Sequence, residues 1–156
     1  MPEAGAAPDF EFVARARIAV DRPRIVGRTG EAQRRVVPIL EGRFDGPLLA
    51  ARVLPGGADW QTDHADGVLD IEARCLIETD DGVTISVVNR GLRSAEPAVM
   101  ARLAAGERVA PHEYYFRSAP VFDAPPGPYF WMRRSVFVAF GEREPDAVIL
   151  RLFRWR

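Results

Sequence analysis

The segment Val68-Leu-Asp-Ile-Glu-Ala-Arg-Cys-Leu-Ile-Glu-Thr79 has the two-residue alternation of a β-strand with unlike faces. One face carries Leu69, Ile71, Ala73, Cys75 and Ile77, and the other carries Asp70, Glu72, Arg74 and Glu78. The Asp80-Asp-Gly82 that follows is a short turn whose glycine accepts a positive φ. Val83–Asn89 should therefore pair back on this strand as an antiparallel hairpin.

Further strand patterns lie on both sides of the hairpin. They cover Phe10–Val20, Arg34–Leu40, Phe44–Leu54, Tyr114–Phe122, Tyr129–Phe140 and Ala147–Trp155. One helix is predicted over Glu96–Ala105, with Ser94 as its N-cap and Gly106 at its end. These elements favour an all-β, closed antiparallel β-barrel of about eight strands over a two-sheet sandwich, because closure removes sheet edges. The short helix should cap one end.

The chain of 156 residues is expected to form one domain over residues 10–156, after a disordered tail over residues 1–9. A net charge of -1 argues against a nucleic-acid partner, and the absence of a long apolar run argues against a membrane. All 21 basic residues are arginine, which excludes a lysine-bound cofactor. Cys75 is the only cysteine and there are two histidines, so we expect no disulfide, metal or cofactor, and a cytoplasmic location.

Two segments dense in aromatic and charged residues are candidates for a binding site. They are Val53–Gln61, which contains Asp59 and Trp60 after two glycines, and Pro111–Pro120, which contains Tyr115 and Arg117. Either Asp59 and Trp60 face a pocket, or they build a structural turn. Tyr115 and Arg117 share a strand face and suit an anionic ligand, unless Arg117 pairs with an internal carboxylate.

The charged face with Glu72 and Arg74 has two interpretations. It is exposed to solvent, as is usual for one face of an antiparallel sheet, or it faces the barrel interior as a paired set. In the second case Glu72 is a candidate general base. His64 is either one half of a dyad with Asp66 or an exposed loop histidine, and the loop composition favours the second.

The chain resembles the bacterial and fungal proteins catalogued as domain of unknown function 3237. The matching pieces are Arg35–Ile39, Gly42–Pro47, Val53–Gln61, Asp66-Gly67, Ala73-Arg74, Asp80–Gly82, Asn89–Gly91, Glu113–Pro120 and Trp131. The resemblance implies a compact barrel of the lipocalin or streptavidin sort, and it implies no particular activity. This chain departs from the family pattern at Cys75 and Ser86, where tyrosine is usual, and at Arg133, where asparagine is usual.

The predicted function is binding of an apolar or aromatic small molecule that bears an acidic group. The predicted ligand-binding residues are Trp60, Arg74, Tyr115, Arg117 and Trp131, with Asp59 and Glu72 as catalytic candidates. One alternative is a cofactor-independent lyase, isomerase or cyclase in the same pocket, and another is an assembly protein with a filled barrel. A homodimer is expected, because both faces of the C-terminal strands are apolar.

Overall fold

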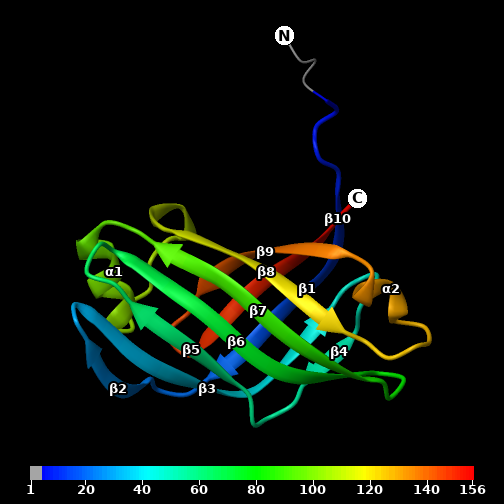
Figure 1. Cartoon of the computed structure of the whole chain (residues 1–156), viewed down its shortest axis with the longest axis horizontal. Coiled ribbons are helices and arrows are strands. Elements are labelled where there is room, and N and C mark those ends of the chain that lie inside the picture. Colours follow the sequence, from blue (N-terminus) through cyan, green and yellow to red (C-terminus); the bar gives the residue numbers. More distant parts are fainter. Residues whose placement is uncertain (1–4) are drawn as a thin grey trace.

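A computed structural model describes residues 5–156 and shows an antiparallel β-barrel (Figure 1). The strands are β1 (Phe10–Val20), β2 (Arg24–Thr29), β3 (Ala32–Asp45), β4 (Ala51–Val53), β5 (Ala58–Asp63), β6 (Val68–Thr79), β7 (Thr84–Ser94), β8 (Tyr115–Asp123), β9 (Val136–Arg143) and β10 (Ala147–Trp155). The helices are α1 (Pro97–Ala104) and α2 (Phe130–Arg133), and Pro111–Glu113 forms one 3-10 turn.

The sheet closes because β1 pairs with β10 on one side and with β3 on the other. Around the circuit the order is β1-β10-β9-β8-β7-β6, then β4 and β5 together, then β3. Both β4 and β5 lie between β3 and β6, so the closed barrel has eight positions. The predicted fold class, a closed antiparallel barrel of about eight strands, is confirmed.

The β6–β7 hairpin forms as the alternation predicts. Ile77 is paired with Ile85, and Gly82 between the strands has a φ of +88°. The apolar face of β6 points into the barrel and its charged face points outward, where Glu72 accepts hydrogen bonds from Arg74 (3.2 Å) and Arg90 (2.9 Å). Of the two interpretations of this charged face, the solvent-exposed one is therefore correct.

Several predicted strands differ from the structure. No strand was predicted where β2 forms, and the strand predicted over Arg34–Leu40 runs on without a break to Asp45 as β3. The strand predicted over Phe44–Leu54 is divided, because β3 ends at Asp45 and β4 begins only at Ala51. The strand predicted over Tyr129–Phe140 begins at Val136, since the consecutive apolar residues before it form α2 and direct Met132 into the barrel. A further strand, β5, occupies part of a segment that the sequence suggested was a loop.

The two ends of the barrel are closed differently, by α1 at one end and by α2 at the other (Figure 1). At the α2 end the interior is filled. The Phe122 and Phe137 rings meet edge to face at 5.0 Å, Trp131 packs on Phe137 at 5.9 Å, and Met132 is 1% exposed.

At the α1 end the predicted capping helix is present, and Leu103 packs on Ile71 and Phe116 of the barrel. Its N-cap is Glu96 and makes no side-chain cap hydrogen bond, whereas the predicted N-cap, Ser94, is the last residue of β7. Within residues 5–156 no helix is long and apolar enough to cross a membrane. The predicted tail over residues 1–9 lies partly outside the described residues, and residues 5–9 form no helix or strand.

Candidate functional site

The α1 half of the barrel encloses a cavity of about 550 Å³. Its wall is mostly apolar and includes Ile18, Val37, Ile39, Ile71, Val87, Phe116, Phe122 and Leu150. The end of α1, the Asp21–Pro23 loop and the turn at Pro145-Asp146 surround its mouth. The filled, dry barrel expected for an assembly protein is therefore not found in this half of the molecule.

A hydrogen-bonded chain of three polar side chains crosses the cavity wall from β3 to β5. Arg35 Nε donates to Gln61 Oε1 at 2.7 Å, and Gln61 Nε2 donates to Asp59 Oδ2 at 2.7 Å. The other carboxylate oxygen of Asp59 accepts the backbone N–H of Glu72 at 3.2 Å. Because a guanidinium can only donate, Arg35 fixes which way the Gln61 amide points and so directs its N–H toward Asp59.

Burial in this wall raises the pKa of the Asp59 carboxyl above its ordinary value, since desolvation penalises the charged form. The hydrogen bond from Gln61 and the backbone N–H of Glu72 act in the opposite direction, as do the charges of Arg93 and Arg35. Asp59 is thus a part-buried carboxylate, held by two donors, that keeps its proton more readily than an exposed aspartate.

Two further guanidinium groups line the cavity. Arg93 on β7 is only 5% exposed, and its Nε has no hydrogen-bond partner among the described residues. Desolvation, together with the charges of Arg143 and Arg35, lowers the pKa of Arg93 to about 10. Asp59 raises that pKa through its charge, yet no carboxylate of the described chain forms an ion pair with Arg93. The cavity wall therefore holds three arginines and one carboxylate.

Arg143 on β9 is fixed from behind by the backbone. Its Nη1 donates to the carbonyl oxygens of Glu144 and of Ala147, the latter at 2.9 Å, and its own N–H donates to the Tyr114 hydroxyl at 2.8 Å. Burial lowers the pKa of its guanidinium. Asn89, four residues before Arg93 on the same inward face of β7, adds a buried amide oxygen without a partner among residues 5–156.

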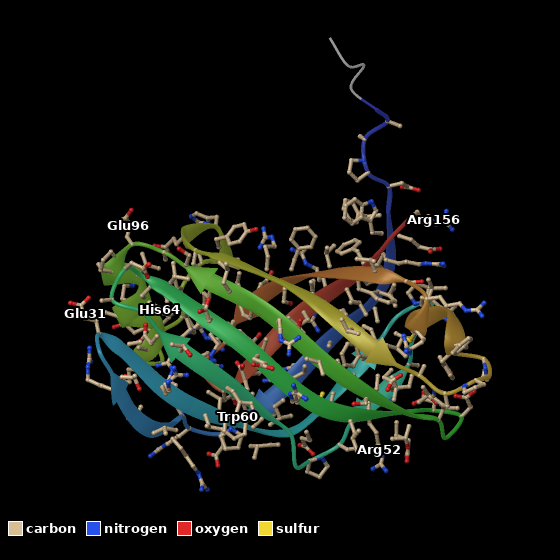
Figure 2. All side chains as sticks on the ribbon, viewed as in Figure 1. Glu31, Arg52, Trp60, His64, Glu96 and Arg156 are labelled. Carbon is tan, nitrogen blue, oxygen red and sulfur yellow. The ribbon has the colours of Figure 1, made fainter. Side chains whose placement is uncertain are left out.

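Of the seven residues predicted for the site, the structure brings Asp59 alone into the cavity. Trp60 follows Asp59 on β5 and so points the other way: it is 56% exposed on the outside of the barrel (Figure 2). The predicted loop is a strand at this point, and a strand sends adjacent side chains to opposite faces. Asp59 and Trp60 therefore do not share an opening.

Tyr115 and Arg117 do share a strand face, as predicted, but it is the outer one. The inner face of β8 is taken by Phe116, Ser118 and Phe122. The Arg117 guanidinium lies outside over the Tyr115 ring (5.1 Å) and the Phe140 ring (4.4 Å). The predicted pairing with an internal carboxylate is likewise absent from the described residues.

The three remaining predicted residues also lie away from the cavity. Glu72 and Arg74 pair with each other on the outer face of β6. Trp131 belongs to α2 at the opposite end of the barrel, where the Arg154 guanidinium lies 5.3 Å from its ring. The expected convergence of these side chains on one cavity consequently does not occur.

Sequence reasoning missed Arg35, Gln61, Arg93 and Arg143, although the signal for them was present. Each one continues an inward-facing row at two-residue spacing: Arg35 precedes Val37 and Ile39, and Arg93 follows Val87 and Asn89. Their charge suggested solvent exposure, whereas the alternation placed them inside. The family departure at Cys75 also lies in the cavity wall, and burial raises the pKa of its thiol to about 11.

No group of three or more histidine, cysteine or acidic side chains suited to a metal is present in residues 5–156. His64 is close to Asp70, with Nε2 and Oδ2 2.7 Å apart, and both side chains are exposed. Asp66 instead accepts the backbone N–H of Val68 at 3.0 Å. The exposed interpretation of His64 is thus correct, and the dyad with Asp66 does not form.

The fold and cavity define a small antiparallel β-barrel with a polar cluster in an apolar interior. The chain belongs to the family described as protein of unknown function (DUF3237), whose model matches residues 8–155. A UPF0311 protein of Clostridium acetobutylicum is 35% identical over 147 residues, which are 94% of this chain and 93% of that protein.

Solved structures agree with this assignment. A conserved protein of unknown function from Rhodopseudomonas palustris superposes with a TM-score of 0.93 at 30% identity, covering 97% of this chain and 99% of that one. A structure described as an enzyme from Penicillium herquei superposes with a TM-score of 0.75 at 19% identity over all of both chains, which is a likeness of fold alone.

Proposed function

We propose that this protein binds a small apolar or aromatic molecule bearing an acidic group inside the α1 half of its barrel. Arg93 is the observation that carries the proposal. Arg93 is buried in a largely apolar cavity, where its guanidinium lies 5.8 Å from the centre of the Phe116 ring, with Nε unpartnered and without an ion pair in the described chain. Taking an unpaired charge out of water costs several kcal/mol, and an anionic group bound beside Arg93 would offset that cost.

The rest of the cavity supports the same ligand. A volume of about 550 Å³ lies within the range typical of small-molecule sites, and walls of Ile, Val, Leu and Phe suit an apolar or aromatic body. The excess of arginine over carboxylate in the wall favours a negative over a positive ligand. At the mouth Asp21 and Asp146 accompany Arg22, so the positive charge is concentrated inside.

Calorimetry with 2-naphthoate and its neutral isostere 2-naphthamide tests the proposal. The native protein should bind naphthoate more tightly than the amide. Arg93→Met should weaken naphthoate binding by about 30-fold or more, the effect of removing one partner of a buried charge pair. Arg90→Met is the matched control, because Arg90 lies on the same strand but faces outward. Equal binding of acid and amide, or unchanged binding in a folded Arg93→Met variant, would contradict the proposal.

We also propose that the protein acts in the cytoplasm as a homodimer. A single cysteine gives the chain no internal disulfide. The outer face of β1, β9 and β10 carries aromatic side chains that a second copy could cover.

A further inference from the structure

We propose that the protein isomerises an enolisable carbonyl compound bound in the cavity. Asp59 would remove a proton from one carbon of this compound and return it to another, while Arg93 stabilises the enolate oxygen. The inference rests on the proposed binding of an acidic small molecule and adds a reaction to it. One carboxylate, held by two hydrogen bonds, lies in the same cavity wall as a guanidinium whose Nε has no partner among the described residues.

The two hydrogen bonds hold Asp59 without using it up. Oδ2 accepts from Gln61 and Oδ1 accepts from the backbone N–H of Glu72, so each oxygen keeps a lone pair for another partner. Since both donors approach the carboxylate, they stabilise its ionised, basic form in a fixed orientation. Arg35 makes this orientation unique, because its Nε occupies the Gln61 carbonyl and leaves only the amide N–H for Asp59.

The surroundings of Asp59 suit a base that must remove a weakly acidic proton. The apolar wall raises the pKa of its carboxyl, and a stronger base accepts a proton from carbon more readily. The other titratable groups lining the cavity are Arg35, Arg93, Arg143 and Cys75 in the wall, with Asp21, Arg22 and Asp146 at the mouth. Asp59 is the one carboxyl among these wall groups, and the Cys75 thiol is a weaker acid, because burial raises its pKa to about 11.

The reaction balances without any added oxidant or reductant. The Asp59 carboxylate takes the proton from the carbon next to the carbonyl, and the C–H electron pair becomes the C=C bond of an enolate. The carbonyl oxygen receives the negative charge, where the unpartnered guanidinium of Arg93 and the backbone-held guanidinium of Arg143 donate hydrogen bonds to it. The protonated Asp59 then returns its proton to another carbon of the conjugated system or to the same one, which completes an isomerisation or an exchange.

Gln61 is the positioning residue in this scheme. It touches Asp59 and not the reacting carbon, and it also lowers the pKa of Asp59 through its hydrogen bond. Gln61→Leu should therefore slow proton transfer and move the midpoint of its pH profile upward, whereas a merely structural role would leave that midpoint unchanged.

Phenylpyruvate is a suitable probe, because it combines an aromatic ring, a carboxylate and exchangeable protons next to a carbonyl. Binding is measured by calorimetry, and loss of the methylene proton signal in D2O is followed by NMR. The native protein should bind the probe and accelerate exchange, with a rate that rises on ionisation of one group whose pKa lies above that of an ordinary aspartate.

Asp59→Asn should keep binding and lower the exchange rate by at least about 100-fold, the usual worth of a general base. Asp70→Asn, on the outer face of β6, is the matched control, and the probe should exchange its protons at the native rate with this variant. Binding without acceleration by the native protein would overturn proton transfer and leave the binding function standing. Absence of binding would overturn both. If Asp59→Asn fails to fold, a native pH profile without the expected ionisation would refute the role of Asp59.

Discussion

The α1 end and the α2 end of this barrel are built from the same eight strand positions but have opposite interiors. At the α2 end, Phe122, Phe137 and Trp131 pack ring against ring, and Met132 fills the space beneath them. At the α1 end, the same strands enclose a cavity lined by apolar side chains and by the cluster of Arg35, Gln61, Asp59, Arg93 and Arg143.

Stability and chemistry are therefore divided along the barrel axis. A ring pair in close contact gains dispersion energy on all sides, whereas a buried, unpaired guanidinium costs free energy in the folded state. The packed α2 end can offset the cost of a polar cluster at the α1 end. If substitutions at the two ends have equal effects, this division does not exist, whereas unequal effects support it.

The largest effect is expected for truncation at the filled end. Phe137→Ala should lower the free energy of unfolding by about 3–5 kcal/mol, because the 1%-exposed ring is packed on Phe122 and Trp131. Phe116→Ala removes the same group from the cavity wall and should cost clearly less, since part of that ring already faces open space. Urea unfolding of both variants measures the difference. Equal losses would mean that the cavity wall is as tightly packed as the α2 end.

The barrel itself could be predicted from sequence more completely than either of its interiors, since α2 was predicted as strand and Trp131 was predicted to line the site. Two-residue alternation predicted both bounds of β1 and β6, and the apolar residues of the closing hairpin predicted both bounds of β10. The residues that line the cavity were predicted wrongly for two physical reasons. A strand, β5, begins directly after the glycine turn, and it places the side chains of Asp59 and Trp60 on opposite faces of the sheet. Arg35 and Arg93 contradict the rule that charge faces water, and only three-dimensional closure shows that their rows point inward.

Cys75 reports on the apolar character of the cavity wall. Because burial raises the pKa of its thiol from 9.0 to about 11, the thiolate fraction at pH 8 falls by roughly 100-fold. Alkylation by iodoacetamide should therefore be about 100-fold slower in the native protein than in urea. Mass spectrometry of timed samples gives both rates. A native rate within a few-fold of the unfolded rate would show that burial does not shield the Cys75 thiol.

The proposed dimer can be tested at the aromatic patch on the outer face of β1, β9 and β10. Phe153 contacts Phe12 (5.6 Å) and Phe140 (5.4 Å) on the outer face, where Phe12 is 39% exposed. If a second copy covers this patch, Phe153→Ser should weaken dimerisation by about tenfold or more in sedimentation experiments. Leu76→Ser, at an exposed position on β6, is the control and should leave it unchanged. A native protein that sediments as a monomer at micromolar concentration would refute the dimer.

The smallest expected effect is a shift in the titration of Asp59, and it probes the polar cluster most directly. Carbon-13 NMR of its carboxyl should give a pKa above that of an exposed aspartate, because desolvation is the largest influence on it. The positive charge of Arg93 acts against that rise, so Arg93→Met should move the pKa of Asp59 further upward. The outward-facing Arg90→Met variant should not.

The raised pKa of Asp59 also makes the stability of the protein depend on pH. A carboxyl with a raised pKa in the folded state holds its proton more tightly there than in the unfolded chain. Its contribution to stability is therefore complete below the ordinary aspartate pKa and is lost as the pH rises through the raised value. In Arg93→Met this loss should extend to higher pH than in the native protein. A pKa of Asp59 that is unchanged by Arg93→Met would mean that the two side chains are electrostatically independent, and the cavity could not present them to one ligand as a charged pair.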